Sequence, residues 1–449
     1  MARKQAFVVS HKEPQLLVPS KPTPHEIKEL SDIDDQKGMR IHVSMIMFFR
    51  ANPLMKARDA VEAIRGALAE ALVWYYPLAG RIIHGPDEDK FMVDCSGEGI
   101  LFVKADSNFS LEDLGDAIKP PCLYSKELLY QVPGSDGILG CPLLLVQVTR
   151  LICGGFVVAI RLNHVITDGL GLAKFLKATG ELAQGASSPS IKPIWRRELL
   201  TAKNLPPRTR YEHPEYNVVG HENDTKMDEK NVVGRGFYFG PNEIKAIRQK
   251  LAQPTSKFNM ITASIWRSRT RALNLTGDET VAITTMVNVS DKTPLAPLQK
   301  GFYGNAAVPA AAVTGARMLS SNPLGYAIDL IQKAKDKVGE DYVRSMVNLM
   351  NEKGKPQILR SRCNIVVSDA SKAGFDRVDF GWGKPVYGGT MDGGSATLSI
   401  YGCCRNVDGE EGVVVPVFLP PPAMERFERE MERLTSLEFG ESLISKSNL

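Results

Sequence analysis

Residues 156–171 read Phe156-Val-Val-Ala-Ile-Arg-Leu-Asn163-His164-Val-Ile-Thr-Asp168-Gly-Leu-Gly171, and the apolar period changes within this stretch. Up to Asn163 the apolar side chains alternate with period two, which predicts a β-strand that ends at His164. From Asp168 onward the apolar residues follow the spacing of an amphipathic helix, and Asp168 is placed to cap its start. A strand that leads into a helix predicts an α/β fold, with His164 at a connection of the kind that often presents chemistry.

Three interpretations of this turn compete. In the first, His164 is a buried structural residue that is hydrogen-bonded to the backbone. In the second, Gly169-Leu-Gly171 opens a dinucleotide-binding helix, but Lys174 stands where the third glycine or alanine of that fingerprint belongs. In the third, His164 is a general base, Asp168 fixes the local geometry, and the glycines let a substrate approach closely. The spacing disfavours the second interpretation and leaves the other two open.

Length and composition predict a soluble globular protein. The 449 residues exceed what one hydrophobic core usually serves, so two domains are expected. Apolar residues make up 43% and charged residues 24% of the chain. The net charge of 55 − 51 = +4 gives no reason to expect a nucleic-acid partner. No apolar run is long enough to cross a bilayer and the amino terminus lacks a secretory core, so we expect a cytoplasmic protein with no membrane partner.

The cysteines and histidines give no metal-binding pattern. The seven cysteines are odd in number and scattered, and neither a CxxC pair nor an HExxH motif occurs. We therefore expect free thiols in a reducing compartment and no metal site.

A proline-broken polar stretch divides the chain. We predict an N-terminal domain over residues 1–185, a crossover over residues 186–231 and a C-terminal domain over residues 232–449. Strands and helices alternate on both sides of the crossover, which predicts two mixed α/β halves. Within the first half we expect two hairpins, formed by residues 91–95 with 100–104 and by residues 143–148 with 155–162.

A second motif resolves the ambiguity about His164. The chain contains Asp379-Phe-Gly-Trp-Gly383 downstream of the HxxxDG motif that begins at His164. Their order and separation resemble the plant BAHD acyltransferases, which transfer an acyl group from coenzyme A to an alcohol or amine. Further similar stretches are Tyr76-Pro-Leu-Ala-Gly80-Arg81 and Gly301-Phe-Tyr303-Gly304-Asn305. The run from Leu30 to Gln36 resembles the branch that makes acetyl and benzoyl esters.

The resemblance implies a fold, a reaction and a set of substrates. It implies two chloramphenicol-acetyltransferase-like domains with a solvent channel between them, and His164 reachable from both ends of that channel. Acyl-CoA would be a co-substrate, no cofactor would be bound permanently, and the acceptor would be a small or medium alcohol. His164 would act as general base without an acyl-enzyme, giving an ester and free coenzyme A. The protein would be a monomer.

The resemblance also implies roles for the other motif residues. Structural roles fall to Asp168, Gly169, Gly171, Asp379, Gly381 and Gly383. Trp382 and Asn305 are candidates for oxyanion stabilisation or for lining the channel. Asp168 would make a structural ion pair, but the usual arginine is absent from the run Asn288-Val-Ser290-Asp-Lys292. Either Lys292 or Arg271 replaces that arginine, or backbone donors hold Asp168.

Other functions fit less well. A serine hydrolase would need a nucleophile elbow, and no G-x-S-x-G motif occurs. An N-acyltransferase of the same fold and a catalytically inactive homologue that only binds ligands both stay open as alternatives.

Overall fold

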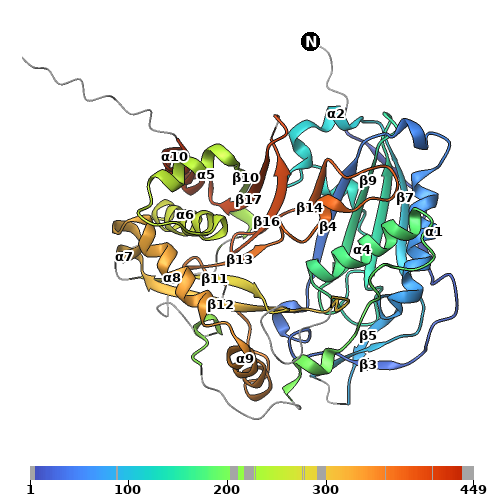
Figure 1. Cartoon of the computed structure of the whole chain (residues 1–449), viewed down its shortest axis with the longest axis horizontal. Coiled ribbons are helices and arrows are strands. Elements are labelled where there is room, and N and C mark those ends of the chain that lie inside the picture. Colours follow the sequence, from blue (N-terminus) through green and yellow to red (C-terminus); the bar gives the residue numbers. More distant parts are fainter. Residues whose placement is uncertain are drawn as a thin grey trace, which may run out of the picture.

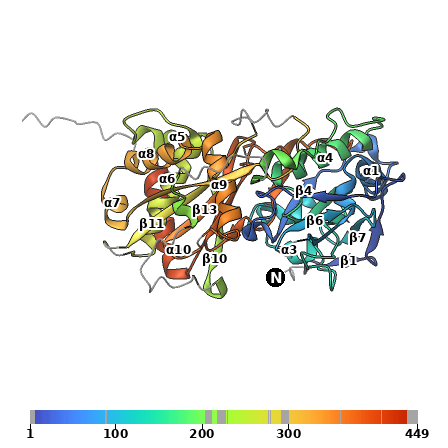
Figure 2. The same ribbon diagram turned by 90° about the horizontal axis from the view of Figure 1, so that it is seen from below.

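The computed structural model describes residues 6–86, 89–202, 211–216, 227, 229–275, 277, 279–290, 300–358, 360–406 and 408–436. Two mixed α/β halves lie side by side along the longest axis of the molecule (Figures 1 and 2). Each half is built on one large sheet. The two-domain α/β class that the sequence predicts is confirmed.

The N-terminal half is built on a seven-stranded sheet with helices α1 (Ala60–Trp74) and α4 (Gly169–Ala183) packed together beside it. Its strand order is β1-β7-β8-β9-β4-β14, with β2 also pairing to β7. The bounds are β1 (Val9–His11), β2 (Gln15–Leu17), β4 (His42–Phe49), β7 (Ile100–Ser107), β8 (Leu144–Arg150), β9 (Phe156–Asn163) and β14 (Tyr387–Thr390). Short helices α2 (Leu111–Leu114) and α3 (Ser125–Leu128) precede β8.

Strand β9 lies deep in this sheet and is buried along its whole length. Its alternating side chains divide between two cores: Phe156, Val158 and Ile160 join the core of α1 and α4, while Val157 and Ala159 join the core on the opposite face. The predicted hairpin of residues 143–148 and 155–162 is confirmed, because β8 and β9 pair antiparallel.

The predicted hairpin of residues 91–95 with residues 100–104 is wrong. A separate three-stranded sheet has the order β3-β6-β5, from β3 (Ile27–Glu29), β5 (Arg81–His84) and β6 (Phe91–Asp94), whereas β7 belongs to the large sheet. Gly97 and Gly99 have φ values of 71° and 95° in the turn between β6 and β7. This turn leads the chain from the small sheet into the large one. Two strands that are adjacent in sequence therefore do not pair with each other here.

The C-terminal half is built on a second seven-stranded sheet of order β10-β17-β16-β13-β11-β12, with β15 on β16. The strands are β10 (Val233–Phe239), β11 (Thr280–Asn288), β12 (Ala307–Gly315), β13 (Asn364–Asp369), β15 (Gly394–Ser395), β16 (Leu398–Arg405) and β17 (Glu411–Leu419). The helices are α5 (Pro241–Gln249), α6 (Lys257–Ala272), α7 (Ala316–Ser321), α8 (Leu324–Asp336), α9 (Glu340–Glu352) and α10 (Pro421–Thr435).

The two faces of this sheet have different surroundings. Side chains such as Ile283 and Val367 pack into the core that also contains the helices. Their neighbours in the chain point to the other face, because successive residues of a strand alternate in direction. That second face looks toward the N-terminal half (Figure 1).

Strand β14 does not follow the predicted division of the chain into two domains at residues 186–231. It lies in the C-terminal half of the sequence but pairs antiparallel with β4, from Tyr387 opposite Phe48 to Thr390 opposite Met45. Figure 1 shows β14 beside β4 in the N-terminal sheet. The predicted assignment of all of residues 232–449 to the second domain is therefore wrong for this strand. The remaining boundaries stay a prediction.

Candidate active site

His164 follows the last residue of β9, as the sequence predicts. Its backbone N–H donates to the Ile41 carbonyl at 2.9 Å, and the Val165 N–H donates to the Asn163 side chain at 3.2 Å. These contacts end the strand and begin the turn that leads into α4. The imidazole lines a cavity of about 310 Å³.

Both halves of the molecule form this cavity. The N-terminal half contributes His164, the segment 36–39, two residues of the β4 region, and the start of α4. The C-terminal half contributes the free face of its sheet, through Met286 and Asn288 of β11, Val366 and Ser368 of β13, and Leu398 and Ile400 of β16. These pairs alternate with the residues that pack toward the helices, so the period of the strands explains why they line the cavity.

The cavity is mostly apolar, with a few polar groups. Apolar side chains come from both halves, including Met39, Ile41, Leu170, Met286 and Ile358. Polar groups include the imidazole of His164, the amides of Asn288 and Asn305, and the charged ends of Arg360 and Asp369. A concave apolar wall with few polar groups is typical of a site for a small organic molecule.

Burial lowers the pKa of the His164 ring. The Asp168 carboxylate is the largest influence in the opposite direction, followed by the histidine's own carbonyl and the Asn305 side chain. Nδ1 is buried and makes no hydrogen bond of normal geometry within the described residues. A lowered pKa favours the neutral form of this ring.

Asp168 is the N-cap of α4, as predicted. Its Oδ1 accepts from the Gly171 N–H at 2.9 Å, and its Oδ2 accepts from the Ala306 N–H at 3.2 Å. Arg271, one of the two cations considered as its partner, pairs instead with Glu430 at 2.9 Å. Lys292 lies outside the described residues. Among the described residues, backbone donors hold this carboxylate, which is the last of the three alternatives that the sequence left open, and an ion pair with Lys292 stays a prediction.

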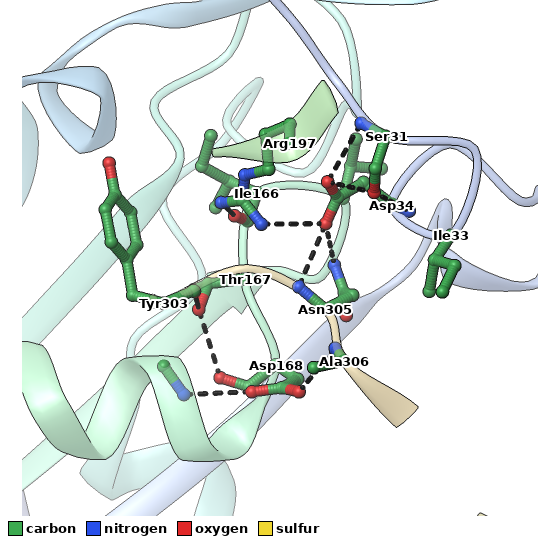
Figure 3. Close-up of polar contacts among 12 residues, drawn as sticks. Ser31, Ile33, Asp34, Ile166, Thr167, Asp168, Arg197, Tyr303, Asn305 and Ala306 are labelled. Atoms are coloured by element: carbon green, nitrogen blue, oxygen red, sulfur yellow. Dashed lines mark hydrogen bonds and ion pairs between the residues drawn. The ribbon is translucent and has the colours of Figure 1, made fainter. Parts of the chain in front are cut away.

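An unpredicted buried ion pair lies next to this turn (Figure 3). Asp34 and Arg197 are almost fully buried, and Arg197 Nη1 lies 3.2 Å from Asp34 Oδ1. Arg197 Nη2 donates to the Ile166 carbonyl at 2.8 Å, in the turn between His164 and α4. The Asp34 carboxylate also accepts from both the N–H and the hydroxyl of Ser31.

Asn305 connects this ion pair to the histidine. Its Nδ2 donates to Asp34 Oδ1 at 2.8 Å and to the His164 carbonyl at 2.9 Å. Because an amide nitrogen has two hydrogens, both are used. In this arrangement the Asn305 amide has no hydrogen left for an oxyanion, and the residue lies in the cavity wall.

The glycines of the HxxxDG turn have different constraints. A Cβ on Gly171 would lie 2.0 Å from Thr167 Oγ1 and 2.1 Å from the Tyr303 carbonyl oxygen. A Cβ on Gly169 would meet only ordinary contacts, the nearest at 3.6 Å from Met45. Gly171 is thus the residue that lets α4 pack against the segment containing Tyr303 and Asn305. Both glycines lie inside the helix, so neither acts as a hinge of the turn.

The DFGWG segment, residues 379–383, does not line the cavity of His164. Asp379 Oδ1 accepts from the N–H groups of Gly381 at 2.7 Å and Gly383 at 2.9 Å. Both glycines have left-handed backbone, with φ of 104° and 96°. This compact turn packs on the C-terminal part of α4, where a Cβ on Gly180 would lie 2.3 Å from the Asp379 carbonyl oxygen.

Trp382 is too far from His164 to act on the reaction. Its ring packs edge-on against Phe156, with centroids 5.5 Å apart. Phe156 begins the eight-residue strand β9 that ends just before His164. At about 3.3 Å per residue, the two ends lie roughly 23 Å apart. This distance is too long for a direct oxyanion contact, Trp382 does not line the cavity of His164, and the indole is part of the N-terminal core.

The sequence analysis missed Asp34 and Arg197. Asp34 lies inside a stretch that was singled out only for its resemblance, and Arg197 lies in the irregular crossover, where no periodicity marks a buried residue. A charged residue in a proline-rich segment looks exposed until its partner is known. Within the described residues no cluster of three metal-ligating side chains occurs, and no helix has the length and apolarity to cross a membrane.

Comparison with known proteins gives the family. The Transferase family model matches residues 7–434. Alcohol acyl transferase 1, allele GSa, of Malus domestica is 47% identical over 95% of this chain and 94% of its own length. Benzyl alcohol O-benzoyltransferase of Petunia hybrida is 47% identical over the same shares of the two chains.

Solved structures share the fold. Vinorine synthase has a TM-score of 0.73 at 23% identity, over 95% of this chain and 98% of its own. TRI101 of F. sporotrichioides, complexed with coenzyme A and T-2, has a TM-score of 0.69 at 17% identity, over 90% of this chain and 97% of its own. Since the family match extends over nearly the whole chain, this protein belongs to the Transferase family, the BAHD acyltransferases that its HxxxDG and DFGWG motifs resemble.

Proposed function

We propose that this protein transfers an acyl group from acyl-CoA to the hydroxyl of a small or medium apolar alcohol. One observation carries the proposal: His164 lines a mostly apolar cavity that both halves of the chain build, and burial lowers the pKa of its ring. The similar proteins named for acyl transfer to alcohols, including benzyl alcohol, support this choice of acceptor.

His164 is the general base of this reaction. Nε2 takes the proton of the acceptor hydroxyl as the oxygen attacks the thioester carbonyl, and the imidazolium then returns a proton to the leaving thiolate. A pKa below the ordinary value keeps the imidazole free to accept that proton at neutral pH. Because donor and acceptor meet in one cavity, the oxygen attacks the donor directly and no acyl-enzyme is required.

The cavity extends along strand β13, and we place one substrate at each end of this strand. Residues 356–358 and 360 line it before the strand begins, and Ser368, Asp369 and Ala370 line it where the strand ends. Six residues of strand separate these ends by roughly 17 Å. The donor and the acceptor therefore approach His164 from different sides.

Acyl-CoA enters at the Asp369 end. A second cavity of about 260 Å³ adjoins the first there, since Asp369 lines both. Its wall contains Lys257, Lys372 and the start of α6, where cations and helix N–H groups favour phosphate. The carboxylates on this wall are already bound, Asp369 to Ser371 and Glu411 to Arg405 at 2.7 Å.

The acceptor enters at the other end, beside residues 36–39, 356–358 and 360. An apolar wall favours an alcohol, because a protonated amine would lose hydration there without a dedicated anionic partner. Both halves of one chain line the site, and we propose that the protein acts as a monomer.

A matrix of acyl-CoA donors against acceptors, read by free thiol and by product mass, tests this function. We expect ester formation with acetyl-CoA or benzoyl-CoA and an alcohol such as benzyl or hexenyl alcohol. Faster acylation of a polyamine would favour the N-acyltransferase, and acyl-CoA binding without thiol release would favour the inactive homologue. A stable acyl adduct on the protein, formed without acceptor, would contradict direct transfer.

A further inference from the structure

An ion pair between the two halves lies at the acceptor end of the cavity. Asp35 is fully buried, and its Oδ2 accepts from the Nζ of Lys355. The same carboxylate accepts from the Phe91 N–H at 3.1 Å and from Arg40 Nη2 at 3.1 Å. Lys355 also donates to the Asp89 carbonyl, which accepts from Arg40 as well. Lys355 is the part of this cluster that belongs to the C-terminal half.

The backbone at Lys355 forms a left-handed turn just before a segment that lines the cavity. Helix α9 ends at Glu352, and Gly354 and Lys355 follow with left-handed φ values of 63° and 58°. The Lys355 N–H donates to the Met350 carbonyl at 2.9 Å, which fixes this turn. A lysine rarely adopts this conformation, so its surroundings must hold it there.

Both partners directly precede cavity-lining segments. Asp35 comes before residues 36–39, and Lys355 comes before residues 356–358 and 360. The ion pair therefore fixes the distance between two segments of wall, one from each half, at the end of the cavity opposite Asp369.

We propose that the Asp35–Lys355 ion pair determines which acceptors enter, by fixing the width of the acceptor entrance. This inference rests on the proposed function. With the pair intact, small and medium alcohols pass and bulky ones are excluded. Without it, residues 356–358 move away from residues 36–39, and bulkier acceptors gain access while the donor end is unchanged.

Lys355→Met tests the proposal, since methionine nearly keeps the length of the side chain and removes its charge. Asp35 keeps Arg40 and the Phe91 N–H, so the fold should survive. Lys353→Met is the matched control, because Lys353 is an exposed residue of the same helix end and loses the same charge. Lys355→Arg, which keeps the charge, should behave like the wild type.

The first readout is kcat/KM for a bulky alcohol, such as geraniol, relative to that for hexanol. We expect Lys355→Met to raise this ratio by about fivefold to tenfold, the low end of what one steric contact discriminates. The KM for acyl-CoA should stay the same, and Lys353→Met should match the wild type. An unchanged ratio in Lys355→Met, or an equal change in both variants, would overturn the proposal.

The second readout does not depend on turnover. Amide hydrogen exchange of residues 36–39, Gln357 and Ile358 should be faster in Lys355→Met than in Lys353→Met. If the wild type transfers no acyl group, the proposed function fails, and the exchange data alone then decide whether the ion pair closes this entrance. Equal exchange in the two variants would refute that closure.

Discussion

The protonation state of one imidazole governs the chemistry at the residue scale. Because burial lowers the pKa of His164, the neutral base persists below the pH at which an exposed histidine becomes charged. We expect kcat/KM to be level near neutral pH and to fall on acidification, with an apparent pKa below about 6.5. A pH–rate profile with an alcohol acceptor measures this. An acidic limb centred above that value would contradict the assignment.

Asp168→Asn tests two effects of the Asp168 carboxylate, its contribution to stability as a helix cap and its influence on the pKa of His164. Asparagine keeps one side-chain oxygen for a cap but loses one of two acceptors, so we expect a loss of about 1 kcal/mol in stability and a lower melting temperature. Because Asp168 raises the pKa of His164, its removal should also move the acidic limb of the pH profile to lower pH. Thermal melts and pH profiles of the same preparation test both expectations.

The effect of Asp168→Asn should be small compared with the removal of one partner from a buried ion pair, which costs about 3–5 kcal/mol. A loss of that size would show that Asp168 has a cationic partner after all. An unchanged melting curve beside a collapsed turnover number would show that the residue orients the imidazole instead.

His164 and Asp168 could be predicted because their positions follow from local pattern. The period changes from two to that of a helix within a few residues, and this change places both side chains. Trp382 and Arg197 could not be placed in this way. One lies at the far end of β9 and the other inside an irregular segment, and only tertiary packing determines either position.

At the scale of elements, the contact between α4 and the segment containing Tyr303 and Asn305 positions the site. Gly171→Ala would force a methyl group onto the Tyr303 carbonyl, so we expect a loss of roughly 1–3 kcal/mol in stability together with reduced activity. Gly169→Ala is the matched control, since its Cβ meets only ordinary contacts. Urea unfolding and turnover of both variants measure the difference, and equal effects would contradict this packing role.

Elements with strong local periodicity were predicted correctly, namely the hairpin of β8 and β9 and the helix α4. The pairing of β6 and β7 was predicted wrongly, because both runs look like strands and a glycine-rich turn lies between them. Which sheet a strand joins depends on contacts with residues far away in the chain. Strand β6, for example, lies between β3 and β5 in the small sheet. Local sequence carries little information about such partners.

At the scale of the whole molecule, Asp34, Arg197 and Asn305 join three distant parts of the chain around the histidine turn. Asp34→Asn would leave Arg197 as an uncompensated buried charge, and we expect a loss of about 3–5 kcal/mol. Asp116→Asn is the control, because its ion pair with Lys119 is exposed and worth less than about 1 kcal/mol. Denaturant titration of both variants measures the contrast, and similar stabilities would refute the role of the buried pair.

The overall class and the two-half architecture could be predicted from alternating strands and helices and from the motif resemblance. The exchange of β14 into the N-terminal sheet could not, because a four-residue strand rich in glycine has no distinctive period. The cavity between the halves likewise depends on which face of the second sheet the helices leave free.

The most direct test of the central claim is ester formation by His164→Ala in a single turnover with saturating acyl-CoA and alcohol. His164 lines the cavity, and its backbone N–H keeps its bond to the Ile41 carbonyl in the variant, so this variant should melt cooperatively, as the wild type does. We predict a rate lower by roughly 10²–10⁴-fold, the usual contribution of a general base. A folded His164→Ala variant that forms ester at nearly the wild-type rate would contradict the account.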